Sequence, residues 1–418
     1  MVRRSRKGVS NSIAGAAIVV VLVIAALAGY FLTNSGTAST TSTSSTSSTS
    51  TSLLTTSSSS SALSSSTTTT TSSSTFTTSV ASTVMNDLAS AAQAECAAST
   101  TGSCLTIYTT QDAGNWQEYY GPAFDAQFPW AAGKVNYISW SQSDETTHVL
   151  SDYATHQVEA DIVDGTLAGL IPDYQGGAFM NYTSPEAYLM NYSSDAIGPA
   201  WIQQDLAIVH MVYNPTVLAK DHLPVPQNWS ALASPIYKNN IAFQSGTALS
   251  ITTAEFYYLY TQLGNASWTA LMKGIAANNP MITGAAGDAE SDVLNGYAAI
   301  GIDTIDSYVT ALQGDPNAPL KIVDIEPMVY TPGVLAITNG TPHPAMAKLV
   351  EAWFISSAGQ KAIAQTNHLP YQTSLGADVL SYLPSDYVLR DAYSTYQQTA
   401  LFQNTGGWSD TFKTIFGA

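Results

Sequence analysis

Basic side chains are scarce in this sequence, and charged residues of either sign are few. Only 10% of the 418 residues are charged, and 13 Lys and Arg stand against 30 Asp and Glu, for a net charge of −17. Four of the bases lie in the first seven residues and no acid precedes Asp87, so the chain from Asp87 onward has nine bases against 30 acids. This deficit excludes a basic nucleic-acid-binding surface, and the 45% of hydrophobic residues excludes a wholly disordered chain.

The signatures of the common enzyme classes are also missing. The sequence has no G-x-S-x-G, no H-E-x-x-H, no glycine-rich phosphate loop and no Cys-x2-Cys pair. We therefore expect a protein that is not an enzyme and uses no cofactor. His148, Asp152 and His156 recur every four residues, which would allow a metal site. A solvated helix face is favoured, because the outer two would lie about 12 Å apart along a helix.

Cysteine is nearly absent, since only Cys96 and Cys104 occur. Outside the cell such a pair favours a disulfide, worth about 2.5 kcal/mol, over a metal site, because no histidine is near in sequence. Five N-x-S/T sequons fit a glycosylated exterior. They begin at Asn181, Asn191, Asn228, Asn265 and Asn339.

The N-terminal part predicts attachment to a membrane. Residues 1–12 are basic, and 13–32 contain no charge and would span about 30 Å as a helix. No Lys or Arg follows for about a hundred residues, so residues 1–12 are expected in the cytoplasm and the bulk of the chain at the cell surface, outside the membrane. Cleavage after Gly8, cleavage after Ala28 and full retention of this transmembrane anchor or signal stay open. The Arg-Ser-Arg-Lys-Gly sequence before the apolar run resembles archaeal class III signal sequences, which implies a retained anchor.

Residues 33–83 contain 41 Ser or Thr in 51 positions and almost nothing apolar. Such a segment cannot bury enough surface to fold, so we predict a disordered Ser/Thr-rich linker, or stalk, between membrane and domain. A low-complexity stretch without a role is the alternative.

Strands and helices alternate along the rest of the chain. Strand-like runs at 105–111, 135–140 and 160–163 are separated by helical spacing, which predicts a parallel α/β sheet. A second series starts with the strand run at 206–215 and continues with helices at 253–264 and 268–277. We predict two lobes with separate sheets, joined by crossovers near Tyr213 and Val329. The expected boundaries are 84–212 and 329–372 for lobe 1, 213–328 for lobe 2 and 373–418 for a C-terminal helical segment.

Four motifs in order resemble one known family. They are VYNP at 212–215, Pro226-x-x-Trp229, SPIYKNNIA at 234–242, and a return strand (332–337) followed by a helix that ends in SSAGQ and by Leu369-Pro370. Together they resemble the type II solute-binding proteins of ABC importers, especially the iron, thiamine and polyamine group. The resemblance implies a bilobal periplasmic-binding-protein type II fold, a small-molecule or metal-ion ligand in an interlobe cleft, and an ABC permease as partner.

In parallel α/β sheets, ligands bind at the loops beyond the carboxyl ends of the strands. The candidate ligand-binding residues on these loops are Thr109, Thr110, Gln111, Asp112, Ser141, Asp144, Asp164, Thr166, Ser245, Thr247, Asp303, Asp306 and Tyr308. Hydroxyls and carboxylates without a nearby arginine suit a cation or a neutral polar solute. Many of these residues are alternatively helix N-caps.

Three further alternatives depend on single features. The iron-binding members of the family use adjacent tyrosines where this chain has Ser307-Tyr308, which disfavours ferric iron. Trp116 and Tyr308 are predicted to lie against an organic cation or a sugar, whereas helix N-termini at the cleft would favour anions.

A pilin-like structural or adhesive protein and, less favoured, a secreted hydrolase are the other functional classes. The excess of acids predicts an acidic working environment.

Overall fold

The computed structural model describes residues 71–99, 102–323, 328–393 and 399–417. Residues from Thr69 to Ala418 form one compact unit. The predicted basic segment 1–12, the predicted anchor 13–32 and most of the predicted linker 33–83 lie outside the described residues. Within the described ranges, no helix combines the length and the apolar character needed to cross a membrane.

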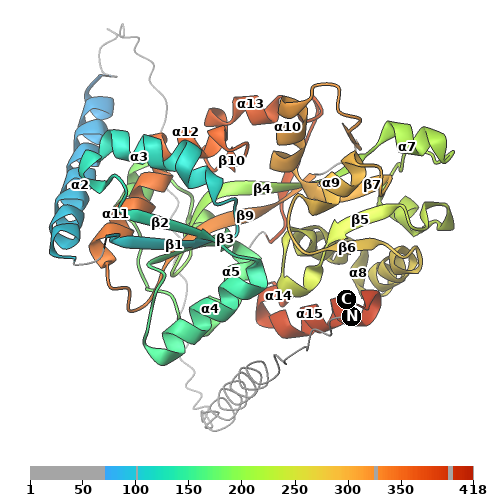
Figure 1. The fold of residues 1–418 in the computed structure, drawn as a ribbon, viewed down its shortest axis with the longest axis horizontal. Coiled ribbons are helices and arrows are strands. Elements are labelled where there is room, and N and C mark those ends of the chain that lie inside the picture. The colour runs from blue at the N-terminus through green and yellow to red at the C-terminus, as the bar shows by residue number, and fades with distance from the viewer. Residues whose placement is uncertain (1–70, 100–101, 324–327, 394–398, 418) are drawn as a thin grey trace, which may run out of the picture. The chain divides into compact units, whose positions relative to one another are not determined.

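One mixed sheet organises this unit (Figure 1). Its strand order is β2-β1-β3-β9-β4-β7-β5-β6. Of the three remaining short strands, β8 and β10 pair with β4, and β11 pairs with β9. The bounds are β1 Leu105–Thr109, β2 Val135–Ser139, β3 Ile162–Thr166, β4 Ile202–Tyr213, β5 Ile241–Gln244, β6 Met281–Thr283, β7 Ile300–Thr304, β8 Lys321–Ile322, β9 Met328–Ile337, β10 Leu369–Pro370 and β11 Leu389–Asp391. The strands predicted at 105–111, 135–140, 160–163 and 206–215 are therefore confirmed as β1 to β4.

The two long strands β4 and β9 join the two halves of the sheet, of which the first contains β2, β1 and β3 and the second contains β7, β5 and β6. β9 pairs antiparallel with β3 on one side and with β4 on the other, and β4 continues to β7. The expectation of two separate sheets is wrong, because crossover strands of 12 and 10 residues are long enough to belong to both halves. The residue boundaries of the two lobes stay predictions.

Helices cover both faces of the sheet (Figure 1). Their bounds are α2 Thr71–Ala98, α3 Gly121–Gln127, α4 Gln142–Thr155, α5 Leu167–Gln175, α6 Pro185–Leu189, α7 Pro215–Lys220, α8 Ile251–Ala277, α9 Asp288–Leu294, α10 Ile305–Gly314, α11 Pro344–Ile355, α12 Ser357–Gln365, α13 Ala377–Leu380, α14 Ala400–Gln403 and α15 Thr405–Phe416, with a short π-helix η1 at Trp116–Tyr120. Gly264 adopts φ 70° and ψ 164° inside α8, so two helical segments meet there. This agrees with the two helices predicted at 253–264 and 268–277.

The core is continuous on one face of the sheet and divided on the other. Alternate residues of a strand point to opposite faces, and Tyr108 joins one cluster while its neighbour Ile107 joins another. The first cluster extends under both halves, from Tyr108 to Phe243. On the opposite face, one cluster covers β1, β3 and β9 and a second covers β4 and β5, as Ile107 and Ala242 show.

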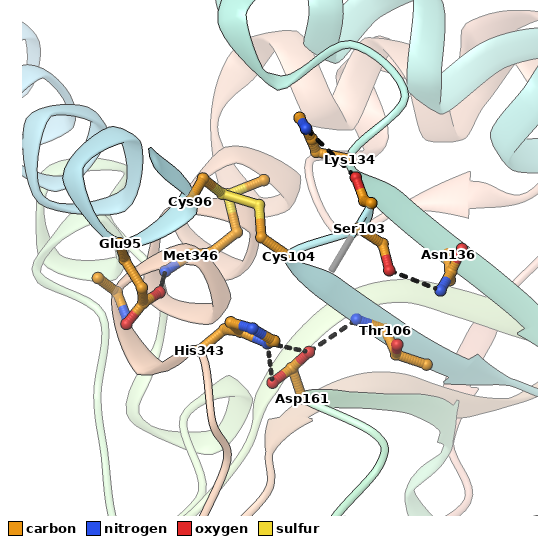
Figure 2. The surroundings of a disulfide bond; sticks show 12 residues. Glu95, Cys96, Ser103, Cys104, Thr106, Lys134, Asn136, Asp161, His343 and Met346 are labelled. Carbon is orange, nitrogen blue, oxygen red and sulfur yellow. Dashed lines mark hydrogen bonds and ion pairs between the residues drawn. A yellow bond between two sulfur atoms is a disulfide. The ribbon is translucent and has the colours of Figure 1, made fainter. Parts of the chain in front are cut away.

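Helix α2 is fixed to the first half by a disulfide and by a helix cap (Figure 2). Cys96 near the end of α2 forms a disulfide with Cys104, which directly precedes β1. The Glu95 carboxylate accepts hydrogen bonds from the backbone N–H groups of Ala345 (3.1 Å) and Met346 (2.8 Å) at the start of α11. α2 begins at Thr71, so residues 71–83 of the predicted disordered linker are helical.

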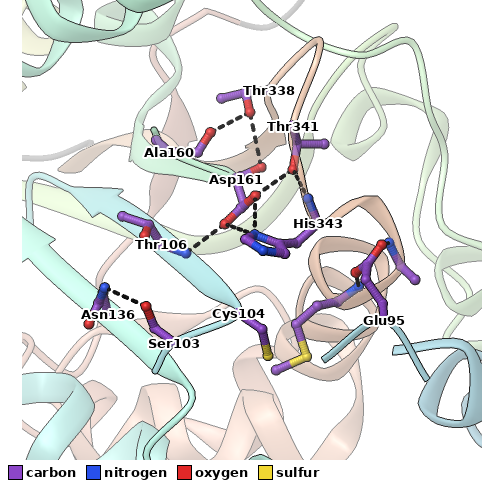
Figure 3. A network of polar contacts seen from close by, with 12 residues as sticks. Glu95, Ser103, Cys104, Thr106, Asn136, Ala160, Asp161, Thr338, Thr341 and His343 are labelled. Carbon is purple, nitrogen blue, oxygen red and sulfur yellow. Dashed lines mark hydrogen bonds and ion pairs between the residues drawn. The ribbon is translucent and has the colours of Figure 1, made fainter. Parts of the chain in front are cut away.

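A buried carboxylate organises the same end of the sheet (Figure 3). Asp161, which is 1% exposed, accepts hydrogen bonds from the Thr106 backbone N–H (2.7 Å) and from Thr341 Oγ1 (2.5 Å). His343 Nδ1 lies 3.2 Å from Asp161 Oδ1. Burial raises the pKa of Asp161, and its hydrogen-bond donors and His343 oppose that rise. The network ties β1 and β3 to the chain that leads into α11.

Candidate functional site

The described residues line a cavity of about 740 Å³, to which both halves of the sheet contribute. The β1 loop contributes Thr110–Asp112, and the end of β3 contributes Asp164–Thr166. From the other half, the starts of α9 and α10 contribute Gly287, Asp288 and Asp306, among others. The volume falls in the range of about 300 to 1,000 Å³ that is typical of small-molecule sites.

Six of the thirteen predicted site residues line this cavity. They are Thr110, Gln111, Asp112, Asp164, Thr166 and Asp306. Thr110, Gln111 and Asp112 follow β1, Asp164 and Thr166 lie at the end of β3, and Asp306 follows β7. Since β1 is parallel to β3 and β7 is parallel to β5, the strand-end rule located them.

The other seven predicted residues do not line the cavity. Four of them lie at helix starts, and two of these cap a helix: Ser141 accepts from the Asp144 backbone N–H, and Ser245 accepts from that of Thr247. Asp144 and Ser141 are exposed at the start of α4, and Ser245 and Thr247 belong to a short 3₁₀ turn before α8.

Burial accounts for the remaining three. Thr109 is fully buried and donates to Asp164 Oδ2 at 2.9 Å. Asp303 is 1% exposed and accepts from the backbone N–H groups of Gly287, Glu290 and Thr304. Tyr308 is 8% exposed and lies edge-on to His210, with ring centroids 5.6 Å apart.

The aromatic contacts expected for a ligand are also not where the sequence predicts them. Trp116 stacks on Tyr137 at a centroid distance of 5.7 Å in the first-half core. Neither Trp116 nor Tyr308 lines the cavity, whereas Tyr119 does. Tyr119 is therefore the aromatic side chain available to a ligand.

Several lining residues escaped the sequence prediction. The charged ones are Glu118, Asp205, Asp288, Glu290 and His368. The strand run was expected to begin at Leu206, whereas β4 begins at Ile202, and Asp205 therefore seemed to lie outside it. His368 lies between α12 and β10, where the local pattern gives no signal.

A β-bulge aims Asp205 into the cavity. The register between β4 and β9 shifts between Gln203 and Asp205, so Gln204 is the extra residue. The Gln204 side-chain amide donates to Asp164 Oδ1 behind the cavity. Asp205 is paired with Gly333 of β9, which also lines the cavity.

Asp164 is buried among hydrogen-bond donors. Its Oδ2 accepts from Tyr137 (3.2 Å) as well as from Thr109. Burial, followed by the nearby charge of Asp205, raises the pKa of Asp164 to about 7, although these donors oppose the rise. Asp164 therefore titrates near neutrality.

Asp205 and His368 influence each other. Burial raises the pKa of Asp205 to about 6, while His368 and the Gln111 side-chain amide, 3.3 Å away, favour its ionised form. Burial lowers the pKa of His368, but the carboxylates of Asp306, Asp205 and Asp164 together raise it above its ordinary value. The His368 imidazolium and the carboxylates of Asp164, Asp205 and Asp306 thus stabilise one another, and these four residues are called the floor of the cavity.

Negative charge dominates the lining. Asp112, Glu118, Asp288 and Asp306 accompany the buried acids, and none of the described lining residues is Lys or Arg. The N-cap residue of α5 and residues at the starts of α9 and α10 also line the cavity, and helix N-termini favour anions. At α9 and α10, however, Asp303 already accepts from three of the backbone N–H groups. The carboxylates therefore make the electrostatic potential of the cavity negative.

No group of three or more His, Cys, Asp or Glu within the described ranges is arranged to hold a metal ion. This finding includes His148, Asp152 and His156 on α4, whose spacing had allowed a metal site. His148 instead packs against Trp140, with ring centroids 4.2 Å apart.

Comparison with known proteins identifies the family. The family model described as bacterial extracellular solute-binding protein matches residues 175–390, which is more than half of the chain. A curated relative, the phosphoglycerate transport regulatory protein PgtC of Salmonella typhimurium, is 25% identical over 170 residues. That match covers 40% of this chain and 42% of the relative, so the chain spans less than half the length of this relative.

Solved structures share the fold over most of their length. Iron-bound HitA from Pseudomonas aeruginosa has a TM-score of 0.58 at 16% identity, over 75% of this chain and 99% of HitA. AfuA from Actinobacillus pleuropneumoniae has a TM-score of 0.60 at 18% identity, over 76% and 97% of the two chains. A periplasmic thiamin binding protein has a TM-score of 0.59 at 15% identity, over 75% and 96%. The α/β periplasmic-binding-protein fold is thus confirmed, and the chain belongs to the family of bacterial extracellular solute-binding proteins.

Proposed function

We propose that this protein is the extracellular receptor of an ABC importer, which captures an organic cation in its cavity and delivers it to the membrane permease. The observation that carries the proposal is the lining: acidic and hydroxyl side chains surround about 740 Å³, and no Lys or Arg is among the described lining residues. Ammonium groups pair with carboxylates and hydroxyls of this kind.

The size and spread of the acids favour an organic cation over a metal ion. Asp112 and Asp164 come from the first half, whereas Asp288 and Asp306 come from the second. A polyamine-like solute with separated amino groups would contact both sets at once. A neutral polyhydroxylated solute, such as an oligosaccharide, is the second candidate, because Tyr119, Thr110 and Thr166 supply a ring face and hydroxyls.

Two of these proteins are described with phosphorylated compounds: PgtC is named for phosphoglycerate transport, and the AfuA structure has fructose-6-phosphate bound. We do not carry these ligands over to this chain. A phosphate group is usually held by Arg or Lys, and the single arginine after residue 6, Arg390, does not line the cavity. Iron, as in HitA, would need a compact ligand set.

The proposed receptor is tethered to the cell surface. Residues 13–32 would anchor it in the cytoplasmic membrane, as the resemblance to archaeal class III signal sequences implies, and 33–70 would act as the linker. The anchor alone would also suit a pilin-like subunit, but such a subunit has no need of a solute cavity. A secreted hydrolase is less favoured, because the sequence has neither a G-x-S-x-G nor an H-E-x-x-H motif.

A thermal-shift screen of the purified full-length chain tests the proposal. The panel comprises spermidine, putrescine, thiamine, ferric ion, maltooligosaccharides, phosphate and fructose 6-phosphate. We expect a rise in the unfolding midpoint with spermidine or putrescine at neutral pH. Stabilisation by phosphate compounds alone would overturn the solute class, and stabilisation by sugars alone would establish the second candidate.

A further inference from the structure

His368 is the one cavity-lining side chain within the described ranges that can carry a positive charge. It directly precedes β10, which pairs with β4 so that Pro370 faces Asp205. His368 Nδ1 lies 2.9 Å from Thr366 Oγ1 and 3.2 Å from the Thr366 carbonyl oxygen. The Thr366 hydroxyl donates to the Ile363 carbonyl. Both neighbours of Nδ1 are thus acceptors, so Nδ1 carries a hydrogen and Nε2 gains or loses the second proton.

The charged groups that raise the pKa of this imidazole are acidic. Asp164 comes from β3, Asp205 from β4 and Asp306 from α10, and these three carboxylates favour the imidazolium form. The Tyr120 hydroxyl of η1 lies 3.4 Å from Thr366 Oγ1, and burial keeps the pKa of Tyr120 well above its ordinary value. Around His368, the cavity lining therefore favours the charged imidazolium form over the neutral ring.

A ligand ammonium at the floor would meet the same carboxylates. Two like charges that share one set of counter-ions repel, so the proton of His368 and the ammonium compete. Glu290 also lines the cavity and is 2% exposed. Its Oε1 has no hydrogen-bond partner in the described part of the chain, so it is a further acceptor for a ligand. Its other oxygen, Oε2, lies 3.3 Å from His210 Nε2.

Building on the proposed function, we propose that the floor formed by Asp164, Asp205, Asp306 and His368 is a proton-exchanging ammonium subsite. The ligand's ammonium takes the place of the proton on this cluster, which is released to solvent. Charge is conserved in the exchange, since one positive charge enters as one leaves.

The exchange makes binding dependent on pH. Asp164 and Asp205 have raised pKa values, of about 7 and about 6, so part of the released proton comes from them and the cluster titrates as a unit. Affinity for an ammonium compound should fall as pH falls through this range, by up to about tenfold per pH unit for one exchanged proton. The receptor would thus release a cation when its surroundings become acidic.

Titration calorimetry of the full-length chain with spermidine tests the exchange. Experiments at pH 6.5 in cacodylate and in MES, which differ in ionisation enthalpy, give the number of protons released. We expect roughly 0.5 to 1 proton per spermidine, and weaker binding at pH 5.5 than at pH 7.5. Binding without proton release would overturn the subsite and leave the solute class intact. Absence of binding at every pH from 5.5 to 8.5 would overturn both.

Two variants separate His368 from the carboxylates. His368→Gln keeps a polar side chain without a titrating proton, and should release fewer protons and show a flatter pH dependence. His156→Asn is the matched control, because His156 is exposed, lies outside the cavity and has a left-handed backbone that asparagine tolerates. The control should match the wild type. Equal proton release from His368→Gln and wild type would assign the proton to the carboxylates and overturn the role of His368. If His368→Gln does not fold, the wild-type proton count still decides.

Discussion

Gly333 of β9 lies directly opposite Asp205 of β4, so close that a methyl group on Gly333 would overlap Oδ1 of Asp205. Thr166 of β3 is the partner of Gly333 on its other side. Asp205, Gly333 and Thr166 therefore form one row across three strands, and all three line the cavity. The missing side chain at 333 is what lets the Asp205 carboxylate lie where it does.

Replacing this glycine should damage the cavity more than the fold. In Gly333→Ala, the new methyl group displaces the Asp205 carboxylate, and we expect spermidine to bind at least about tenfold more weakly, a loss of about 1.4 kcal/mol. Calorimetry measures the affinity, and circular dichroism checks the fold. Gly406→Ala is the control, because a methyl group there meets no atom within 4 Å. Unchanged affinity in Gly333→Ala would show that Asp205 does not contact the solute.

The disulfide should stabilise the protein without influencing the solute. Cys96→Ser frees the end of α2 from β1, and we expect a loss of about 2.5 kcal/mol in the free energy of unfolding. Because none of the described side chains of α2 lines the cavity, solute affinity should stay the same. Denaturant unfolding with and without reductant provides the measurement. Reductant should destabilise the wild type and have no effect on Cys96→Ser; equal sensitivity of both would contradict the assignment.

Buried acids should make the fold more stable in acid. Glu255 of α8 and Glu351 of α11 are each 2% exposed, and burial raises the pKa of both to about 8. Each folded-state pKa lies above the ordinary value of 4.5, so folding favours the protonated form. Below about pH 4.5 both groups are protonated in the folded and the unfolded chain, so the full stability is present. As pH rises toward 8, only the unfolded chain ionises freely, and the free energy of unfolding falls progressively.

Thermal unfolding at pH 5 and pH 8 measures this effect. We expect a lower unfolding midpoint at pH 8 than at pH 5. In Glu255→Gln, the difference in the free energy of unfolding between the two pH values should be smaller by at least about 1.4 kcal/mol, the equivalent of one pKa unit. Asp386→Asn, which alters an exposed acid, should behave as the wild type. A midpoint that is higher at pH 8 than at pH 5 would refute the argument.

The sequence located elements better than it located side-chain roles. The strands β1 to β4 and the two segments of α8 were predictable, because alternation and helical spacing are local signals. The strand-end rule found Thr110, Asp164 and Asp306. It could not tell them from Ser141, whose side chain is used up in capping α4.

The remaining site residues depend on long-range geometry. Asp205 enters the cavity through the bulge at Gln204 and the absence of a side chain at Gly333, and neither feature has a local pattern in the sequence. His368 is brought to the floor by the pairing of β10 with β4. The single sheet was missed for the same reason, since strand length does not reveal how many partners a strand has.

The measurement that tests the central claim most directly is the affinity of the full-length chain for spermidine when one cavity charge is removed. Asp306 lines the cavity and is half-buried at the start of α10. Asp306→Asn retains the shape of the side chain and should weaken binding at pH 7.5 by about tenfold, as expected for the loss of one charged contact. Asp315→Asn, an exposed change just beyond α10, should leave binding unaltered. Unchanged spermidine affinity in Asp306→Asn, or tighter binding of phosphate compounds than of spermidine by the wild type, would contradict the account.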